Sequence, residues 1–287
     1  MPRPRAERSA GQIEAEAVEQ FTVHAESFAA AAVINDERAL SILDELAAIE
    51  PGDRVIDVAC GPGIVTCRLA RHGAPVVAID LTPRMLELAA ERSAAAGLTD
   101  LTPFTVARMD HLPFPDGSFT VAVNRYALHH AADPEQVAAE LVRVVAPGGR
   151  LVIVDFAAGP NPIASAAYDD AERLRDPSHV GNLTPDEQQQ LFLTRGCRLV
   201  AAPAYRIEAR LATVLAGSHG PDHDGFRRAF EASLDGHRLG VNARRVDSDG
   251  DGAIAGGVDG AIAGGVDGAI AGDIAFDYPI VAQLFSR

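Results

Sequence analysis

The chain has 287 residues, a formal net charge of −15 and three cysteines. This length suits one large or two small domains, and we expect a single domain with a sizeable core. Because the charge is strongly negative, binding to nucleic-acid phosphates or anionic lipids is disfavoured. The odd number of cysteines and the lack of a ~20-residue apolar run predict free thiols, no membrane span and a cytoplasmic location.

The N-terminal region is predicted to begin as a disordered lead over residues 1–12, and residues 13–287 form the single domain. Amphipathic patterns over residues 13–34 and 36–49 indicate two helices, which end before Pro51 and Gly52. We expect the helices within residues 13–49 to form part of a lid.

Strands and helices alternate from residue 50 to residue 156, which is the expected cofactor-binding core. Strands are expected near 53–58, 75–80, 102–107, 119–124 and 150–156, and helices near 64–72, 82–96 and 133–145. This alternation is typical of a doubly wound parallel sheet. Residues 157–195 are mainly helical and interrupt it after the fifth strand. A segment covering the substrate is expected there, because ligands bind beyond the carboxyl ends of the strands.

The C-terminal part predicts a strand near 197–207, helices near 208–217 and 222–238, and a last strand over 274–285. Pro279 predicts a bulge or an interruption in that strand. Before it, Asp-Gly-Ala-Ile-Ala begins at residues 251, 259 and 267, so the segment 246–273 holds an eight-residue repeat. Three copies are too few to bury a core of their own, and we expect a surface loop.

One motif carries the cofactor prediction. The residues from Val55 to Val58 indicate a buried strand, Gly61-Pro-Gly63 a turn, and the residues from Ile64 a helix whose positive end faces the turn. Asp80 ends the next strand, where a carboxylate can bind a ribose diol. The pattern therefore predicts a nucleotide-like ligand over this turn.

Two details separate this motif from a dinucleotide site. The third glycine of the G-x-G-x-x-G pattern is replaced by Thr66, and Asp57 lies just before the turn. A carboxylate there repels a pyrophosphate and suits an ammonium group. S-adenosylmethionine offers an ammonium group, a ribose diol and no phosphate, and its demethylated product is S-adenosylhomocysteine. Asp110, after the third strand, can accept a hydrogen bond from an adenine amino group.

With these motifs the chain resembles the class I S-adenosylmethionine-dependent methyltransferases, in particular the branch related to ubiquinone and menaquinone C-methyltransferases. The resemblance covers about residues 20–205. It rests on VIDVACGPG (55–63), VAIDLTPRML (77–86), DHLPFPDGSF (110–119), YALHH (126–130) and VAPGGRLVIV (145–154). It implies an α/β, Rossmann-like, doubly wound and mainly parallel sheet of seven strands, with an antiparallel last strand and a helical lid.

The resemblance also implies a set of cofactor-binding residues. Asp80 matches the residue that holds the ribose hydroxyls, Met85 one near the adenine, and Asp110 one that contacts its amino group. Gly61 and Gly63 line the methionine moiety. Ala59 departs from the family's usual glycine, and its methyl group is expected to fit. The full expected set is Asp57, Ala59, Gly61, Gly63, Asp80, Leu81, Met85, Asp110, His111 and Asn124.

The acceptor side is predicted from residues beyond strand ends and within the lid. Candidate catalytic residues are His179, His129 and Asp155, with His130 a weaker candidate, and candidate pocket residues are His24, Phe28 and Tyr168. The histidines have structural alternatives in turns, beneath the cofactor or on the surface, and Asp155 has one as a helix cap. Histidines and aspartates also occur near residues 219–224, but they fit a polar loop, and we expect no metal site.

The leading functional prediction is a methyltransferase that acts on a small, hydrophobic organic molecule by carbon or oxygen methylation, in quinone-like or specialised metabolism. Because the methyl donor is a reactive sulfonium, alignment of the acceptor and exclusion of water supply much of the acceleration. Two alternatives stay open: a protein that binds the cofactor without methylating, and a nicotinamide oxidoreductase. A homodimer is a further expectation.

Overall fold

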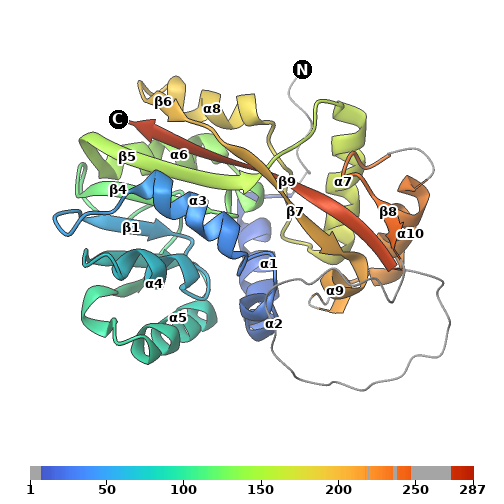
Figure 1. Ribbon diagram of the computed structural model, residues 1–287, viewed down its shortest axis with the longest axis horizontal. Helices are drawn as coiled ribbons and strands as arrows, with labels where there is room; N and C mark the ends of the chain where they lie inside the picture. Colours follow the sequence, from blue (N-terminus) through green and yellow to red (C-terminus); the bar gives the residue numbers. More distant parts are fainter. Residues whose placement is uncertain (1–7, 217, 219, 235–237, 247–272) are drawn as a thin grey trace.

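The described part of the chain is built around one nine-stranded sheet. Figure 1 shows how the sheet and its helices are arranged. The computed structural model describes residues 8–216, 218, 220–234, 238–246 and 273–287. The strands are β1 (Val55–Val58), β2 (Val76–Asp80), β3 (Phe104–Val106), β4 (Phe119–Arg125), β5 (Val145–Phe156), β6 (Arg198–Ala201), β7 (Ala204–Arg210), β8 (Arg244–Val246) and β9 (Asp273–Ser286).

The main path of the sheet has the order β3-β2-β1-β4-β5-β9-β6. The strands from β3 to β5 pair in parallel, and β9 runs antiparallel to both β5 and β6. These findings confirm the mainly parallel, doubly wound sheet with an antiparallel last strand, but the predicted number of seven strands is too low, because the described residues form nine and seven of them make up this path. β7 and β8 are two further strands that pair with β9.

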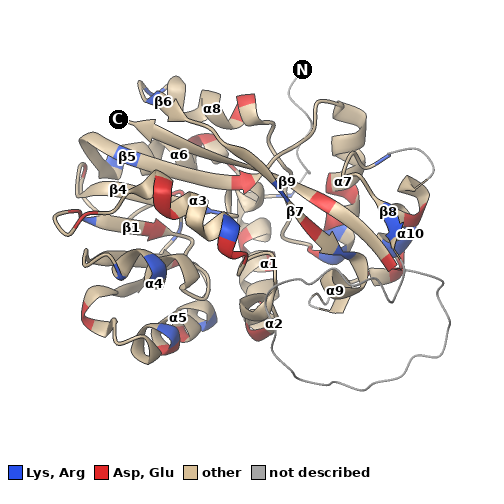
Figure 2. Ribbon diagram, in the orientation of Figure 1, with Lys and Arg blue, Asp and Glu red and all other residues tan. Residues whose placement is uncertain are grey.

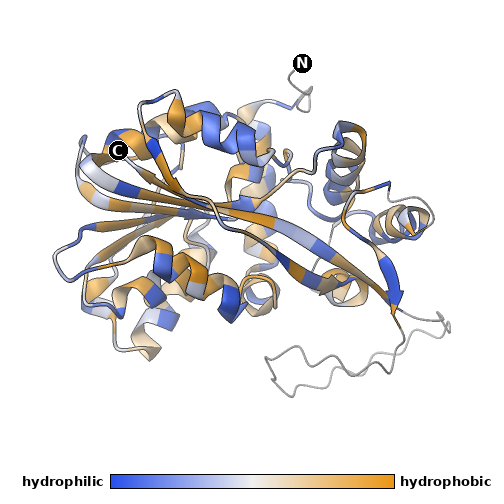
Figure 3. Ribbon diagram, turned by 45° about the horizontal axis from the view of Figure 1, so that its top comes forward, coloured by the Kyte–Doolittle hydropathy of each residue, from blue (hydrophilic) through white to orange (hydrophobic). Residues whose placement is uncertain are grey.

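Helices cover both faces of the sheet (Figure 3), and several of them pack apolar residues against it. The helices are α1 (Ala10–Val23), α2 (Ala25–Ala30), α3 (Glu37–Ala47), α4 (Ile64–Ala70), α5 (Pro83–Ala95), α6 (Pro134–Val144), α7 (Pro162–Arg175), α8 (Pro185–Leu193), α9 (Leu211–Ala216) and α10 (His223–Ser233). Short 3₁₀ turns occupy Thr99–Leu101 and Leu128–His130. α3 and α4 pack on one face, and α6 and α8 pack on the other.

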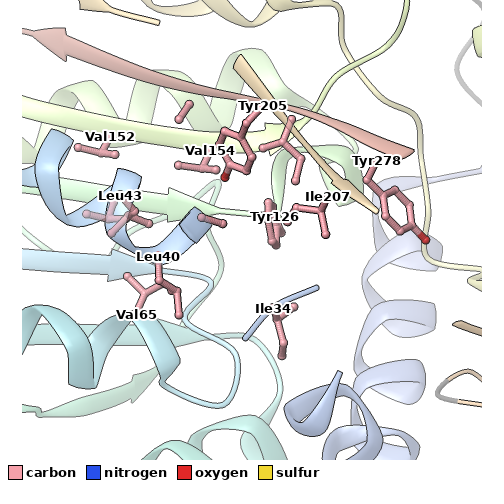
Figure 4. Packing of buried hydrophobic residues seen from close by; sticks show 14 of the residues in the cluster. Ile34, Leu40, Leu43, Val65, Tyr126, Val152, Val154, Tyr205, Ile207 and Tyr278 are labelled. Atoms are coloured by element: carbon pink, nitrogen blue, oxygen red, sulfur yellow. The ribbon is translucent and has the colours of Figure 1, made fainter. Parts of the chain in front are cut away.

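The core on the α3 side converges near the carboxyl ends of β4 and β5. Leu40 and Leu43 of α3 pack there with Val152 and Val154 of β5. Figure 4 shows Tyr126, just after β4, beside residues of β7. This packing holds the end of β4 in a fixed position next to the loop that follows β1.

The N-terminal helices differ from the prediction. Ser9 caps α1 by accepting a hydrogen bond from the backbone N–H of Gln12, and the Gln12 side chain accepts one from the Ser9 N–H. This capping box starts the helix at Ala10, so the predicted disordered lead over residues 1–12 is too long. Residues 1–7 lie outside the described residues. The single helix predicted over residues 13–34 is two helices, because the backbone of His24 leaves the helical region between α1 and α2.

The C-terminal strands also correct the prediction. The strand predicted over 197–207 is broken before Ala204, and β7 continues through residues 208–210, which were expected to be helical. These residues pair with β9, and sheet pairing overrides their local preference. The predicted helix over 222–238 is α10, which ends at Ser233.

Pro279 does not interrupt β9, contrary to the prediction. β9 pairs with β7 across Pro279 without a change of register. The Pro279 carbonyl accepts a hydrogen bond from Ala157, just past the end of β5. The N and O atoms of one residue point to the same side of a strand, so the position of the missing N–H also faces the β5 side. Pro279 therefore removes no hydrogen bond between β9 and β7.

The repeat loop predicted over 246–273 lies outside the described residues, apart from Val246 and Asp273, which end β8 and begin β9. Among the described helices, none is both long enough and apolar enough to cross a membrane.

Candidate active site

The loop between β1 and α4 places backbone groups at the carboxyl end of the sheet. Ala59, Gly61 and Gly63 all have left-handed backbone conformations, with φ of 59°, 52° and 75°. Glycine adopts this region freely, whereas an alanine there is strained. The Cys60 N–H donates to the Ile79 carbonyl at 2.9 Å, so the loop is also tied to β2.

Thr66 explains why the dinucleotide pattern is incomplete. Its hydroxyl donates to Oδ2 of Asp57 at 2.6 Å, and both side chains are buried. Burial raises the pKa of Asp57 to about 6, although the Thr66 hydrogen bond and the charge of Arg125 act in the opposite direction. The ionised form of a carboxylate that is this poorly solvated is stabilised by a cationic ligand.

Asp80 ends β2 and holds the loop in place. Its two carboxylate oxygens accept hydrogen bonds from the backbone N–H groups of Gly61 at 2.9 Å and Thr82 at 2.8 Å. Burial raises the pKa of Asp80, and these backbone donors partly offset the rise. Each carboxylate oxygen can accept a further bond, so a ligand diol can be bound there.

Asp110 lies at the rim, where it is paired with Arg108. The guanidinium donates to both carboxylate oxygens, at 2.9 Å and 2.7 Å, and also forms an ion pair with Glu14 of α1. Glu26 of α2 pairs with Arg84 of α5 in the same way. These ion pairs therefore tie α1 to the segment after β3 and α2 to α5.

These residues surround a cavity that lies between the strand ends and the N-terminal helices. Seven of the ten predicted cofactor-binding residues line it: Asp57, Ala59, Gly61, Asp80, Leu81, Met85 and Asp110. On the lid side, Ile13, Ala17, Phe21 and Phe28 line it from α1 and α2. The cavity therefore has carboxylates on the sheet side and a mostly apolar wall on the helix side, where Glu14 is the charged exception.

The other three predicted residues lie elsewhere. A Cβ atom on Gly63 would lie 2.8 Å from that of Ala89, so Gly63 allows α4 to approach α5 closely. His111 is exposed. Asn124 is buried in β4 and donates from Nδ2 to the Val58 carbonyl at 2.9 Å, which ties β4 to β1.

The predicted catalytic residues lie together below the cavity. Nδ1 of His129 is 2.7 Å from Oδ1 of Asp155, and the His129 backbone N–H donates to Oδ2 of the same carboxylate at 3.0 Å. Burial alone would lower the pKa of His129, but Asp155 raises it above the ordinary value. Figure 2 shows acidic residues at the ends of β1 and β5, where Asp57 and Asp155 lie.

Two more histidines complete what we term the histidine cluster (His129, His130 and His179). Nε2 of His179 is 2.9 Å from Oδ1 of Asp169, and its ring centroid is 5.7 Å from that of His129. Nδ1 of His130 lies 3.2 Å from the Ser178 carbonyl. Burial and the neighbouring His129 lower the pKa of His130. Only His130 of the cluster lines the cavity. The catalytic role of His129, His179 and Asp155 stays a prediction.

The three predicted pocket residues lie in different parts of the structure. Phe28 lines the cavity, and its ring packs edge-on against Phe21. His24 lies at the junction of α1 and α2 and is not among the lining residues. The Tyr168 hydroxyl donates to Oε1 of Glu172 at 2.7 Å, and its ring lines a second, smaller cavity under α7.

Sequence reasoning missed Arg125 and Tyr126, which line the cavity at the end of β4. Their signal is their place in the chain: they follow a buried strand directly and precede the Leu128–His130 turn. Tyr126 also has a left-handed backbone with φ of 55°, which is uncommon for a bulky residue. Among the described residues, no group of His, Cys, Asp and Glu side chains could hold a metal ion.

The cavity fits S-adenosylmethionine by the chemistry of its donor set. Asp57 is a buried carboxylate that has spare acceptor capacity for an ammonium group, and Asp80 has it for ribose hydroxyls. Leu81 and Met85 supply apolar surface next to Asp80, which suits an adenine ring.

Comparison with known proteins agrees with this site. Residues 56–153 match the family model of a methyltransferase domain. The uncharacterised methyltransferase YcgJ of Bacillus subtilis is 30% identical over 172 residues, which are 60% of this chain and 68% of that protein. The 27-O-demethylrifamycin SV methyltransferase of Amycolatopsis mediterranei is 36% identical, over 49% of this chain and 53% of that enzyme.

A third relative is the ubiquinone/menaquinone biosynthesis C-methyltransferase UbiE of Ectopseudomonas mendocina, 30% identical over 54% of this chain and 62% of that enzyme. The matches thus span between about half and two thirds of the relatives' length. The crystal structure of YcgJ superposes with a TM-score of 0.70 and 21% identity, covering 88% of this chain and 98% of that one. Geranyl diphosphate methyltransferase superposes with a TM-score of 0.58 and 16% identity, covering 88% and 78%. The chain belongs to the class I S-adenosylmethionine-dependent methyltransferases and is related to the UbiE branch.

Proposed function

We propose that this enzyme transfers a methyl group from S-adenosylmethionine to a small, largely apolar organic acceptor, by carbon or oxygen methylation. The observation that carries the proposal is the composition of the cavity wall. Ile13, Phe21 and Phe28 face it from the lid, and Ile34 faces it from the segment before α3. An acceptor enclosed by such a wall gains most of its binding free energy from apolar contact.

The sheet side of the cavity is proposed to hold the donor. Asp57 binds the ammonium group, Asp80 binds the ribose hydroxyls, and Asp110 accepts from the adenine amino group. The Arg108 guanidinium bonds one side of the Asp110 carboxylate. It also pairs with Glu14, so it links this carboxylate to α1.

When bound, the cofactor supplies an electrophilic methyl group on a positively charged sulfur. The protein's own contribution is to orient the acceptor and to exclude water, which the apolar faces of α1 and α2 do. The histidine cluster is proposed to be structural: Asp155 holds the Leu128–His130 turn through His129, and Asp169 holds the segment after α7 through His179.

The names of two relatives support an acceptor of this class. One acts on a demethylated rifamycin, and another belongs to ubiquinone and menaquinone biosynthesis. The first name denotes O-methylation and the second C-methylation. Carbon and oxygen methylation therefore both stay open for this chain.

The test is incubation of the full chain with labelled S-adenosylmethionine and a panel of phenols, hydroxyquinones and prenylated quinols. We expect S-adenosylhomocysteine to form in step with a labelled organic product. Phe21→Ala removes apolar contact surface from the cavity wall without touching the predicted donor carboxylates, so it should raise the acceptor KM more than the donor KM. Val23→Ala, on an exposed position of the same helix, is the matched control.

Tight cofactor binding without label transfer to any acceptor would contradict the proposal. That result would favour a protein that uses the bound cofactor without methylating.

A further inference from the structure

Arg125 is a buried cation at the edge of the cavity. It is the last residue of β4, it lines the cavity, and only 9% of it is exposed. A charged side chain this deeply buried is costly unless its charge is paired and its N–H groups are bonded. Its partners in the described part of the chain account for only a fraction of its donors.

One nitrogen of the guanidinium is bonded and two are not. Nη1 donates to the Ile34 carbonyl at 2.9 Å, whereas Nε and Nη2 are buried without a hydrogen-bond partner among the described residues. The guanidinium carbon lies 4.2 Å from the centroid of the Tyr126 ring, which stabilises the cation without using an N–H group. The two unbonded atoms are adjacent on one edge of the planar group.

That edge matches a planar anion. Guanidinium groups bind carboxylates through two parallel N–H···O bonds, and they do so more strongly than through one neutral hydrogen bond. The protein does not supply the carboxylate: the nitrogens of Arg125 bond to no Asp or Glu among the described residues. A bound ligand can supply it.

The position of Arg125 relative to Asp57 supports this conclusion. Asp57 of β1 pairs with Val123 of β4, and alternate residues of a strand face the same side, so Asp57 and Arg125 lie on one face of the sheet. Both line the cavity, and the Arg125 charge acts to lower the pKa of Asp57. At the ends of β1 and β4 the cavity thus presents a carboxylate and a guanidinium group to its contents.

We propose that Arg125 binds a planar oxyanion inside the cavity through Nε and Nη2. The chemistry has two sources: the carboxylate of the donor's amino-acid group, and an acidic oxygen of the acceptor, such as a carboxylate, phenolate or enolate. The second source rests on the proposed function and narrows it to acceptors that carry an acidic group. An acceptor held as its anion would also reduce the need for a protein base.

The first arm of the test measures donor binding by calorimetry. S-adenosylhomocysteine is compared with 5′-methylthioadenosine, which has the same nucleoside and no amino-acid group. If Arg125 binds the donor carboxylate, Arg125→Gln weakens S-adenosylhomocysteine binding by about 10- to 100-fold and leaves methylthioadenosine binding unchanged. Arg125→Lys keeps the charge but not the paired donors, so it gives an intermediate loss. Arg71→Gln, an exposed arginine at the end of α4, is the control.

The second arm measures acceptor-side binding to the protein saturated with S-adenosylhomocysteine. Benzoate and a panel of phenolates are the probes, and benzamide is the neutral analogue of benzoate. If Arg125 binds the acceptor, an anionic probe binds the wild-type complex, benzamide does not, and Arg125→Gln removes the binding while S-adenosylhomocysteine affinity is unchanged.

The proposal is overturned if Arg125→Gln and Arg125→Lys fold, as shown by circular dichroism, and neither changes the binding of any anionic ligand. If Arg125→Gln does not fold, the outcome is decided by Arg125→Lys. Wild-type affinity of this variant for every anionic ligand would overturn the proposal. Weaker binding in only one arm would support it. Because both arms measure binding, failure of methyl transfer does not affect their outcome.

Discussion

The donor side of the site and the histidine cluster differ in how their residues are brought together. Asp57, Gly61 and Asp80 belong to one β-α-β unit, and the Gly61 N–H is bonded directly to Asp80. The histidine cluster joins residues after β4 to the segment after α7, which lies far along the chain. The proposed donor side is therefore fixed by local connections, whereas the cluster depends on the position of the segment after α7.

The two regions also treat their carboxylates differently. Asp155 uses both oxygens on the protein, bonding the His129 ring and backbone and the Phe156 N–H. Asp57 has one side-chain partner, and it lines the cavity. Asp155 does not line the cavity. A carboxylate that is bonded within the protein away from the cavity stabilises the fold, and one that lines the cavity with unused acceptor capacity can bind a ligand. Substitutions of these residues test this distinction.

The largest effect is expected at Asp155. Asp155→Ala removes three hydrogen bonds and leaves a buried histidine without its counter-ion, so unfolding free energy should fall by about 3–5 kcal/mol at pH 6. The pKa of His129 is raised in the folded state. The ion pair therefore stabilises the protein fully below the ordinary histidine pKa, and this contribution is lost as pH rises through the folded-state value.

Urea denaturation at pH 6 and pH 9 measures this effect, and the wild-type advantage should be smaller at pH 9. Asp100→Ala, at an exposed position, should change stability little. A loss below about 1 kcal/mol at pH 6 would show that Asp155 is not a structural anchor.

At Asp80 we expect a binding effect. Asp80→Asn keeps the size of the side chain but removes the charge and one acceptor, so affinity for S-adenosylhomocysteine should fall by about 100-fold. Thermal-shift titration measures the loss, and Asp116→Asn, at an exposed position, is the control. Unchanged affinity would remove Asp80 from the donor site.

A smaller effect is expected from the titration of Asp57. Burial raises its pKa to about 6 in the ligand-free protein, and only the ionised form attracts an ammonium group. Affinity for S-adenosylhomocysteine should therefore be level above this pH and decline below it, by up to about tenfold per pH unit. Binding measured from pH 5 to pH 8 should show the decline in the wild type and a weak, level profile in Asp57→Asn. Parallel profiles would place the titrating group elsewhere.

The smallest effect is expected at Ala59. Its φ of 59° costs about 1–2 kcal/mol for a residue with a Cβ atom, and the added chain entropy of glycine offsets part of the gain. Ala59→Gly should raise the unfolding free energy by less than about 1 kcal/mol in urea denaturation. A clear loss of stability would mean that the Ala59 methyl group makes packing contacts that outweigh the strain.

The sequence was informative where function and local structure coincide. The turn after β1, Asp80 and Asp110 were predictable because strand ends and turn residues are close along the chain. Arg125 was not selected and His130 was only a weaker candidate, because their surroundings depend on partners that only folding provides: the Ile34 carbonyl, the Tyr126 ring and the Ser178 carbonyl. Pro279 misled the strand prediction because its missing N–H faces past the end of a neighbouring strand.

The most direct test of the difference between the two regions is calorimetric titration of S-adenosylhomocysteine into Asp80→Ala and His129→Gln, both checked for folding. We predict that Asp80→Ala loses measurable binding and that His129→Gln binds within about threefold of the wild type. Retained binding in Asp80→Ala together with lost binding in folded His129→Gln would contradict the assignment of the donor to the strand ends and of the histidine cluster to structure.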